Sequence, residues 1–524
     1  FLMFCLRVGD VKNIIALDVG TSSIRAILYR EDGFIMYKSQ VEYHSDYYDG
    51  GLVEQDPATW LEGSIRVLRD IGNFMNENEY QAEAISVTSQ RSSLIPVDKN
   101  GTPLRSAIMW QDKRTLPQCD YLEKAFGLKY LYQKTGLRVN PYFVLPKIIW
   151  LKENQRDIYN KAYKFLGVQE LIIYQLCGKF VTDYTQGGRT LFMDINSFTW
   201  DPDLLEIAGI NESDLPELLP PGSIVGGLRK EIAEKTGLPE GLQIIIAGGD
   251  QQCAAVALGV TKPGTAEANT GTGSFVLAAV DKAVFDEECR VLVQASAIPG
   301  KWIMEAGIFN TGATYRWFKE QFYKDIPDGQ NTYEIMNKEA AASGVGANGI
   351  VMIPHFQGSA APFWNPYAKG LFFNLSLDHT RGDFVRSIME GIAIELGHNI
   401  RLIQKLTGKI NVVSVAGGMT KSDLFCEIQA NVFNCKVARY KNTEASSLGA
   451  AISAFVALGI FDSEETAQTN MVGKDIQIFE PTKELVDEYH KITLRKMALY
   501  DSINVGDVYK GFMGEDENLL ESLK

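Results

Sequence analysis

The sequence lacks a basic excess. Its 51 lysines and arginines face 65 aspartates and glutamates, so the formal net charge of the 524 residues is −14. Proteins that bind nucleic acid usually carry a basic stripe, because contacts with phosphate groups dominate their affinity. We therefore expect no nucleic-acid partner. A small anionic ligand remains compatible with this charge, provided that backbone amides, helix N-termini or a metal ion hold it locally.

Cysteines and histidines are few and scattered. The seven cysteines include no CxxC pair and the five histidines form no cluster, so we expect neither a disulfide framework nor a structural zinc site. No apolar run approaches the roughly 20 residues that span a bilayer. The apolar opening, residues 1–6, is too short for a signal peptide. We expect a cytoplasmic protein that does not enter a membrane.

Three common catalytic signatures are also missing. The sequence contains no G-x-x-x-x-G-K-[ST] phosphate loop, no H-R-D and D-F-G set, and no G-x-S-x-G turn. These absences argue against a P-loop enzyme, a protein kinase and a hydrolase with a nucleophile elbow.

The length and composition predict a folded chain of two large domains. Hydrophobic residues make up 45% and charged residues 22%, as in ordinary globular proteins. A chain of this length exceeds one core, since domains usually hold about 100–200 residues. Strand-like runs alternate with helical patterns, which predicts an α/β fold. We place the domains at residues 11–257 and 258–500, with a peripheral acidic tail over residues 501–524.

Two helices are predicted from their residue patterns. Over residues 383–406, apolar side chains recur every four positions from Phe384 to Ile400, and Asp383 is the expected N-cap. Residues 446–458 are rich in small side chains, which suits a helix that packs closely against a neighbour.

Two distant stretches share one layout. Residues 12–18 form an apolar run, followed by a Gly/Thr/Ser turn and a second apolar run, and residues 264–280 repeat this order. Each stretch predicts a β-hairpin with a polar tip. Two copies of such a hairpin suggest a duplicated fold with a cleft between its halves.

The first hairpin tip suits a phosphate group. A tight turn leaves backbone amides free for phosphate oxygens, and the hydroxyls of Thr21, Ser22 and Ser23 add donors. Asp18, at the end of the first run, could hold Mg²⁺ directly or through water. The alternative is a plain hairpin turn with an aspartate cap.

Two Gly-Gly turns follow apolar runs farther along the chain. In AGGDQQ, residues 247–252, the glycines expose Asp250 at a sheet edge, where it could take a proton from an attacking hydroxyl; the alternative is a helix cap. In AGGMTKSD, residues 416–423, the glycines offer a flat surface for an adenine ring, with Ser422 within reach. The alternative there is an ordinary strand–helix turn.

In this order and at these spacings, the elements from about Val11 to about Leu458 resemble the FGGY carbohydrate kinases, which belong to the wider actin/Hsp70/hexokinase fold. The resemblance implies an α/β fold with two actin-like (ribonuclease H-like) domains flanking a nucleotide and substrate cleft. It also implies transfer of the γ-phosphoryl group of ATP, with Mg²⁺, to an alcohol group of a small sugar or polyol. Family members often form homodimers.

The resemblance assigns residues position by position. It implies that Asp250 is the catalytic base and that Gln251 lies beside the acceptor. The implied nucleotide-side positions are Thr21, Ser22, Ser23, Arg25, Thr272, Gly312, Arg316, Gly418 and Ser422.

The acceptor side carries a mixed pattern. Residues 89–92 resemble the Asn-Gln-Arg-Glu block of glycerol kinases, with Gln90 and Arg91 in place but Ser92 at the Glu position, which argues against glycerol. The Gln-Met-His-Gly block of xylulokinases is absent, which argues against D-xylulose. Trp110 and Tyr142 match pocket positions, with core packing as the alternative. Another ketose, a tetritol or a dihydroxy-pentanedione (the autoinducer-2 precursor) fits this pattern.

Two other functions were weighed against a kinase. The phosphate hairpins alone fit a non-transferring ATPase or a nucleotide-gated binding protein of the same superfold. The acidic residue after Gly-Gly and the polar pair Gln90 and Arg91 favour the kinase. A sugar-sensing regulator would need an additional helix-turn-helix domain, and about ten residues precede the first predicted strand.

Overall fold

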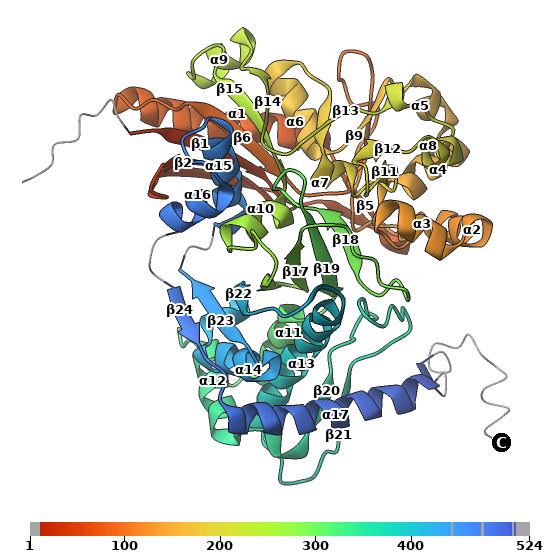
Figure 1. Cartoon of the computed structure of the whole chain (residues 1–524), viewed down its shortest axis with the longest axis vertical. Helices are drawn as coiled ribbons and strands as arrows, with labels where there is room; N and C mark the ends of the chain where they lie inside the picture. The colour runs from red at the N-terminus through yellow and green to blue at the C-terminus, as the bar shows by residue number, and fades with distance from the viewer. Residues whose placement is uncertain (1–10, 328, 442–443, 473–475, 506–507, 510–524) are drawn as a thin grey trace, which may run out of the picture.

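The computed structural model describes residues 11–327, 329–441, 444–472, 476–505 and 508–509. They form two α/β domains, one above the other in Figure 1, each built around one mixed sheet. No helix in these ranges is long and apolar enough to cross a membrane.

The N-terminal sheet has six strands in the order β14-β15-β6-β1-β2-β3. Its strands are β1 (Asn13–Val19), β2 (Ser23–Arg30), β3 (Ile35–Glu42), β6 (Ala84–Ser89), β14 (Ser223–Gly227) and β15 (Gln243–Gly249). β1 pairs antiparallel with β2 and parallel with β6, which in turn runs parallel to β15. The carboxyl ends of β1, β6 and β15 therefore meet at one edge of the sheet, where ligands usually bind in α/β folds.

Helices and small sheets surround this N-terminal sheet. The helices are α1 (Pro57–Glu77), α2 (Leu116–Phe126), α3 (Leu128–Thr135), α4 (Val144–Asn154), α5 (Arg156–Lys161), α6 (Val168–Cys177), α7 (Tyr184–Gly187), α8 (Pro202–Ala208), α9 (Lys230–Thr236) and α10 (Asp250–Ala257). The minor strands are β4 (Asp46–Tyr48), β5 (Leu52–Gln55), β7 (Ile95–Val97), β8 (Ala107–Ile108), β9 (Lys164–Leu166), β10 (Val181–Asp183), β11 (Met193–Asp194), β12 (Thr199–Trp200) and β13 (Glu217–Leu219).

The C-terminal sheet has seven strands in the order β18-β19-β17-β16-β22-β23-β24. Its strands are β16 (Thr265–Thr270), β17 (Ser274–Val280), β18 (Leu292–Ala295), β19 (Trp302–Ile308), β22 (Val412–Ala416), β23 (Lys436–Tyr440) and β24 (Ile476–Phe479). A separate hairpin pairs β20 (Val351–Ile353) with β21 (Leu371–Phe373). The helices that follow α10 along the chain are α11 (Gly312–Phe322), α12 (Thr332–Ser343), α13 (Arg381–Thr407), α14 (Asp423–Phe433), α15 (Ala445–Ala457), α16 (Glu464–Met471) and α17 (Lys483–Val505), of which α15 and α16 lie beside the N-terminal sheet.

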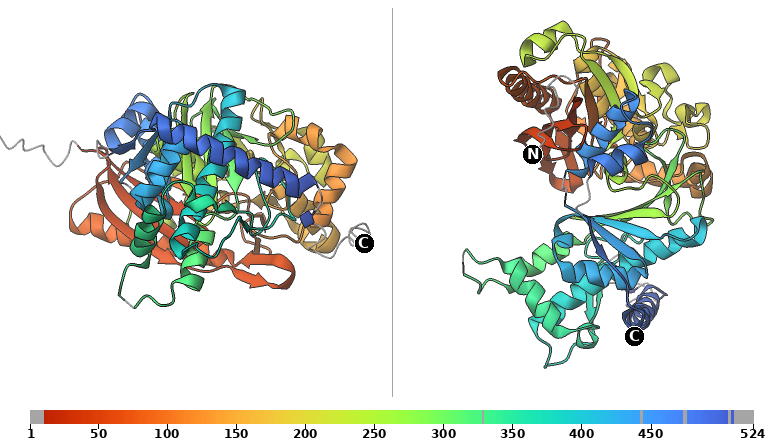
Figure 2. Two further views of the ribbon diagram at one scale, coloured as in Figure 1. Left: turned by 90° about the horizontal axis from the view of Figure 1, so that it is seen from below. Right: turned by 60° about the vertical axis from the view of Figure 1, so that its left-hand side comes forward.

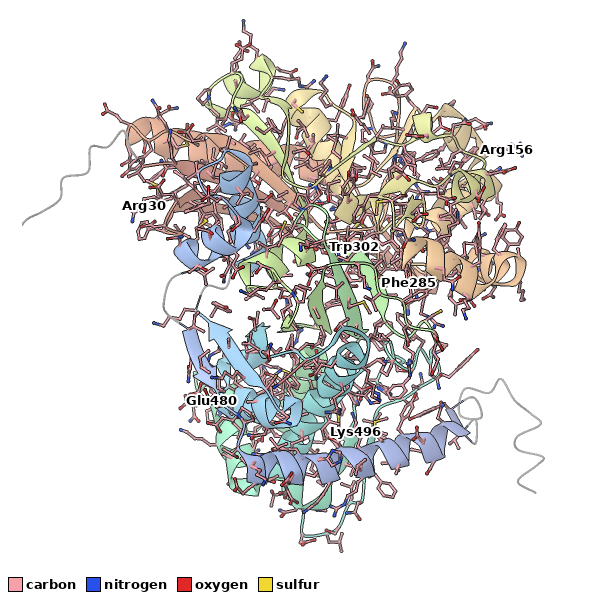
Figure 3. The ribbon with its side chains drawn as sticks, in the orientation of Figure 1. Arg30, Arg156, Phe285, Trp302, Glu480 and Lys496 are labelled. Carbon is pink, nitrogen blue, oxygen red and sulfur yellow. The ribbon has the colours of Figure 1, made fainter. Side chains whose placement is uncertain are left out.

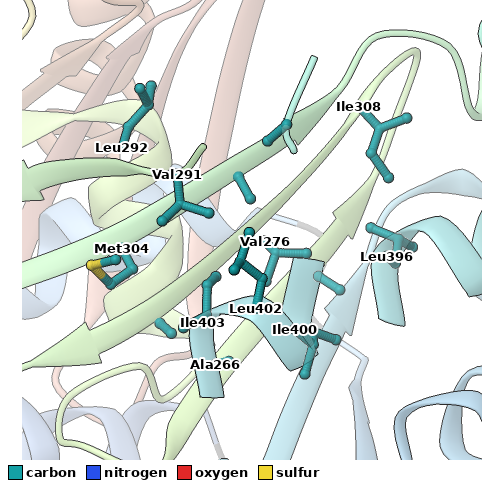
Figure 4. Packing of buried hydrophobic residues seen from close by; sticks show 14 of the residues in the cluster. Ala266, Val276, Val291, Leu292, Met304, Ile308, Leu396, Ile400, Leu402 and Ile403 are labelled. Atoms are coloured by element: carbon teal, nitrogen blue, oxygen red, sulfur yellow. The ribbon is translucent and has the colours of Figure 1, made fainter. Parts of the chain in front are cut away.

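One face of the C-terminal sheet packs on helix α13. Val276 and Met304, from adjacent strands, belong with Leu396 and Ile400 to one buried apolar cluster, which is seen from close by in Figure 4. The predicted helix over residues 383–406 is therefore present, but its start differs from the expectation. Thr380 is the N-cap, and Asp383, three residues later, accepts the Thr380 backbone N–H at 2.7 Å in a capping box.

Both predicted hairpins are present, as β1–β2 and β16–β17. The helix predicted over residues 446–458 is also present as α15, but it packs on the N-terminal sheet rather than on the C-terminal one (Figure 1). A Cβ atom on Gly449 would lie 1.8 Å from the Cys253 carbonyl oxygen, so only glycine allows α15 to approach α10 this closely. α15 thus follows the predicted boundary at residue 258 in the sequence and yet covers the N-terminal sheet, while the boundary itself stays a prediction.

The last long helix, α17, runs along the outside of the C-terminal domain (Figure 2). It continues through residue 505, past residue 500 where we expected the tail to begin, and Tyr500 and Tyr509 are both buried. Residues 510–524 of the expected tail lie outside the described part of the chain.

Candidate active site

The tip of the first hairpin forms a tight turn with free amides. The Gly20 amide donates to the Ser23 carbonyl at 3.0 Å, which closes the turn between β1 and β2. Within the described residues, the Thr21 and Ser22 amides have no hydrogen-bond partner, and the Ser22 side chain is exposed. Adjacent free amides in a turn suit an anionic oxygen.

The Thr21 hydroxyl connects this turn to the predicted acceptor side. It donates to Gln90 Oε1 at 3.0 Å and accepts from Trp110 Nε1 at 3.1 Å. The Trp110 ring in turn lies 5.1 Å from the Tyr142 ring, centroid to centroid. The structure thus joins Thr21, Gln90, Trp110 and Tyr142, although their sequence positions span more than a hundred residues.

Asp18 is a buried carboxylate with one free oxygen. Burial raises the pKa of Asp18 to about 7, although Arg25 lowers it. Its Oδ1 has no partner among the described residues, and its Oδ2 lies 3.9 Å from Arg25 Nε. Arg25 also pairs with Glu444 at 2.8 Å, so its guanidinium is held by carboxylates rather than left open for a nucleotide. A free carboxylate oxygen at a strand end fits a divalent cation.

Few other protein side chains would join Asp18 as ligands of such a cation. No group of three or more His, Cys, Asp and Glu side chains within the described ranges could hold a metal ion. Mg²⁺ usually keeps several waters and is bound by one or two carboxylates together with phosphate oxygens, so a single carboxylate is compatible with it.

Asp250 lies where β15 ends and α10 begins. Gly248 has φ +125°, and a Cβ atom on Gly249 would lie 2.6 Å from Arg91 Cδ, so both glycines are needed at this turn. Gly249 is the N-cap of α10, and Asp250 Oδ1 accepts the Gln251 amide at 2.7 Å. Asp250 is therefore the first residue of α10 rather than its N-cap, and its side chain accepts an amide of the first turn.

The Asp250 carboxylate faces a buried arginine. Its Oδ1 lies 3.6 Å from Arg91 Nε, and 22% of the Asp250 side chain is exposed. Burial raises the pKa of Asp250, whereas Arg91 lowers it. Asp250 is therefore a partly exposed carboxylate whose charge Arg91 neutralises only in part.

Arg91 belongs to a buried cluster at the boundary between the domains. We call Arg91, Arg189 and Glu305 the boundary cluster. Arg91 Nη1 lies 3.1 Å from Glu305 Oε2, and Arg189 Nη1 lies 2.9 Å from Glu305 Oε1. Sequence reasoning missed Arg189 and Glu305, although a lone glutamate in an otherwise apolar strand was an available signal.

The second hairpin tip is covered by the start of α11. The Gly312 amide donates to the Gly271 carbonyl at 3.0 Å, and the Thr311 amide donates to the Thr272 carbonyl at 3.1 Å. A Cβ atom on Gly312 would lie 2.3 Å from the Gly271 oxygen, so the predicted positions Thr272 and Gly312 meet because residue 312 is glycine. Arg316, one turn along α11, is exposed.

The turn at Gly417 and Gly418 packs against the second hairpin. Gly417 has φ +101°, and a Cβ atom there would lie 2.2 Å from the Thr270 carbonyl oxygen. Gly418 has open space where its Cβ would be, as a flat ring requires. Ser422 is the N-cap of α14, with its hydroxyl accepting the Phe425 amide at 3.3 Å.

Polar atoms without partners gather on the acceptor side. Ser92 has φ +69°, and its buried hydroxyl has no partner among the described residues, as is also true of Gln90 Nε2 and Gln251 Oε1. Beneath them, the buried Lys147 ammonium donates to the Ser92 carbonyl at 2.6 Å and to the Tyr142 carbonyl at 2.7 Å. Sequence reasoning missed Lys147. Buried polar groups are normally satisfied, so these free atoms suit a hydroxylated ligand.

Both halves of this site match one family model. The model of the FGGY family of carbohydrate kinases matches residues 13–257 with its N-terminal domain and residues 266–458 with its C-terminal domain.

Two curated relatives extend the match over most of the chain. A glycerol kinase from Saccharolobus islandicus is 35% identical over 468 residues, which cover 87% of this chain and 90% of the relative. A xylulose kinase from Bacillus subtilis is 27% identical over 514 residues, which cover 98% and 99% of the two chains.

Solved structures share the fold. A xylulose kinase from Rhodospirillum rubrum superposes with a TM-score of 0.87 at 26% identity, covering 94% of this chain and 99% of the other. A Plasmodium falciparum glycerol kinase with ADP gives a TM-score of 0.83 at 25% identity, covering 93% and 98%. The two α/β domains described above are thus those of the actin-like fold.

Proposed function

This chain belongs to the FGGY family of carbohydrate kinases, and we propose that Asp250 is the base with which it phosphorylates a small sugar or polyol. Membership makes the chain an ATP-dependent phosphotransferase with an alcohol group as acceptor. The observation that carries the proposal is the half-buried Asp250 carboxylate beside Arg91, at the strand end where the two domains meet.

The proposed reaction is an in-line transfer. An acceptor hydroxyl oxygen attacks the γ-phosphorus of ATP, its proton passes to an Asp250 carboxylate oxygen, and the bond from phosphorus to the bridging oxygen of ADP breaks. Little covalent chemistry is left to the protein, so the rate would come mainly from positioning and electrostatics.

The nucleotide would lie between the two hairpin tips and the turn at Gly417 and Gly418. The free amides of Thr21 and Ser22 on one side and the Thr272 loop on the other are placed to receive phosphate oxygens. The open surface at Gly418 would take the adenine ring, with Ser422 beside it. One of the predicted nucleotide contacts is less favourable, because Arg25 is held by Glu444, whereas Arg316 is exposed and free to meet a ligand.

Asp18 is the residue that we propose for Mg²⁺. Its free Oδ1 fits the ion, and Arg25 Nε lies 3.9 Å from the other oxygen. When bound, such an ion neutralises charge on the phosphate oxygens.

The acceptor would lie among Gln90, Arg91, Trp110, Tyr142 and Gln251. The relatives named above phosphorylate glycerol and xylulose by their names, and this chain has Ser92 with a free hydroxyl beside the acceptor residues. We propose a hydroxylated acceptor of similar size: another ketose, a tetritol or a dihydroxy-pentanedione. A cytoplasmic location and a homodimer complete the proposal; the six described cysteines are free thiols, which suits a reducing compartment.

Substitution of the base tests the proposal. Asp250→Asn should reduce acceptor-dependent ADP release by at least about a thousandfold, because the amide cannot take the proton. ATP binding, measured by calorimetry, should stay within about threefold, since Asp250 contacts the acceptor rather than the nucleotide. Wild-type turnover in this variant would contradict the assignment.

An acceptor screen separates the kinase from a non-transferring ATPase. ADP release would be measured with glycerol, erythritol, xylitol, D-xylulose and dihydroxy-pentanedione, each against a control without acceptor. Release that depends on one of these compounds supports the kinase. Steady release that no compound changes would favour the ATPase.

A further inference from the structure

Strand β19 carries Glu305 on the face of the C-terminal sheet that is turned toward the N-terminal domain. Glu305 lies opposite Leu277 of β17, so the two side chains share a face. Leu277 packs with Ala255 of α10, whereas the alternate residue Met304 joins the core beneath the sheet. Figure 1 shows β17 and β19 directly below α10. A buried carboxylate on this apolar face is strongly disfavoured unless partners neutralise it.

The partners of Glu305 come from the other domain. Its Oε2 lies 3.1 Å from Arg91, which follows β6, and its Oε1 lies 2.9 Å from Arg189, which follows α7. All three side chains are at least 97% buried. Despite burial, the two guanidinium groups hold the pKa of Glu305 below its usual value, so it is ionised. The C-terminal domain thus contributes the one carboxylate that two N-terminal arginines share.

Each arginine also touches the proposed acceptor site. Arg91 Nε lies 3.6 Å from Asp250, and its Nη1 lies 3.1 Å from Gln252 Oε1. The Arg189 guanidinium stacks over the Tyr142 ring, 4.9 Å from its centroid. A chain of alternating charge therefore runs from Arg189 through Glu305 and Arg91 to Asp250.

The geometry points to Glu305 as a positioning residue: from the C-terminal domain it holds Arg91 and Arg189 against the acceptor site and keeps Arg91 divided between two carboxylates. This inference rests on the proposed roles of Asp250 and Arg91. Without Glu305, Asp250 would be the only carboxylate within ion-pair distance of Arg91 in the described part of the chain, and Arg91 would turn its paired N–H groups toward the base. Arg189 would lose its only ion-pair partner among the described residues, and with it the fixed position over the Tyr142 ring.

Several charged groups face Asp250 and decide how it responds. Asp18 from β1 and Glu305 from β19 favour the protonated form of Asp250, whereas Arg91 and Arg189 favour the ionised form. Removing the Glu305 charge should therefore make Asp250 a weaker base and move the acid limb of the kcat/KM profile to lower pH.

Glu305→Gln in the full chain tests the inference, with the most active acceptor of the screen. The amide cannot neutralise two guanidinium groups, so the acceptor KM should rise about tenfold or more, while the KM for ATP stays within about twofold. Glu305→Asp keeps the charge but has a shorter reach, and it should recover part of the loss. Where Glu305→Gln does not fold, as thermal melting would reveal, the graded loss in Glu305→Asp carries the same test.

Glu267→Gln is the matched control. Glu267 is a buried carboxylate on the same face of the same sheet, and neither of its oxygens has a partner among the described residues. This variant should leave the acceptor KM within about twofold of wild type.

Two outcomes would overturn the inference. One is an unchanged acceptor KM and pH profile in Glu305→Gln, and the other is an equal effect in Glu267→Gln. If Asp250→Asn is inactive while Glu305→Gln behaves as wild type, the positioning role fails and the proposed function stands. If Asp250→Asn keeps its turnover, the proposed function itself fails.

Discussion

The boundary between the domains and the interior of the C-terminal domain each hold a buried charged cluster, and the two clusters are completed differently. In the C-terminal domain, Glu395 accepts from His355 at 2.9 Å and from Lys496 at 2.5 Å, and Lys496 also donates to the Gly391 carbonyl at 3.0 Å. We call His355, Glu395 and Lys496 the α17 cluster, because Lys496 brings α17 onto α13 (Figure 3). Both Glu395 oxygens are thus satisfied within one domain.

Several buried polar atoms around the boundary cluster have no hydrogen-bond partner among the described residues. Arg189 Nε, Gln252 Nε2 and both oxygens of Glu267 lie buried without a partner in the part of the chain that the structure describes. Its members also come from two domains rather than one. His355 Nδ1 of the α17 cluster is also buried without a partner among the described residues, so the clusters differ chiefly in whether one domain or two supply their members. The difference suggests that a cluster within one domain stabilises the fold, whereas a cluster shared between domains belongs to the site.

Breaking the α17 cluster should give the largest change in stability. Glu395→Gln removes the charge that neutralises buried Lys496, and the loss of one partner of a buried pair costs about 3–5 kcal/mol. Urea unfolding should detect this loss, while the acceptor KM of the folded fraction stays within about twofold. A changed KM with unchanged stability would reverse the comparison between the clusters.

The same variant should also alter the response to acid. Despite burial, Lys496 and His355 hold the pKa of Glu395 below its usual value in the folded chain. The contribution of the Glu395 charge to the unfolding free energy is therefore fully present above the unfolded pKa of about 4.3. It is lost as the pH falls through the lower pKa of the folded chain. Glu488→Gln, which removes an exposed ion pair on α17, is the control and should cost less than about 1 kcal/mol.

Lys147 sharpens the comparison, because it is buried like Lys496 but contacts carbonyls instead of a carboxylate. Lys147→Met leaves the carbonyls of Ser92 and Tyr142 without their donor, which should cost about 2–3 kcal/mol in unfolding experiments. Both carbonyls belong to acceptor-side segments, so the acceptor KM should rise about tenfold. Burial lowers the pKa of Lys147 to about 7, but both protonation states keep two N–H donors.

Lys152 supplies the control on the same helix. Its ammonium donates at 3.3 Å to the Ala208 carbonyl, away from the acceptor residues. Lys152→Met should change stability by less than about 1 kcal/mol and leave the acceptor KM unchanged. If Lys147→Met lost stability with a wild-type KM, Lys147 would group with the structural α17 cluster.

The sequence predicted the hairpins and α13 but not the charged clusters. The hairpins followed from Gly/Thr turns between apolar runs, and α13 followed from its four-residue period, because both signals are local. The start of α13 was misplaced by three residues, since Asp383 suits both the N-cap and the third position of a capping box.

What could not be predicted depends on contacts between distant residues. Arg189 and Glu305 meet across 116 positions, and Arg91 and Glu305 meet across 214. Each is a single charged residue in its own segment, and no local pattern indicates its partner. The packing of α15 on the N-terminal sheet has the same cause, because a period identifies a helix but not the sheet that it covers.

The smallest expected effect concerns Glu267, the least satisfied member of the boundary region. Burial and the nearby Glu305 raise the pKa of Glu267 to about 8 in the folded chain. The folded state therefore binds a proton that the unfolded state releases above about pH 4.3, so stability falls as the pH rises through this window. Glu267→Met should raise the unfolding free energy at pH 8 by about 1–2 kcal/mol, because it removes two unsatisfied buried oxygens.

The difference between wild type and this variant, followed by urea unfolding from pH 5 to pH 9, isolates the Glu267 contribution from other groups. The difference should be small near pH 5, grow up to about pH 8 and level off above it, where Glu267 is ionised in both states. A constant difference would mean that Glu267 titrates over the same pH range in the folded and unfolded states, and therefore that it finds a partner when ionised. In that case Glu267, which lies beside the boundary cluster but outside the acceptor site, would be as well satisfied as Glu395 of the α17 cluster.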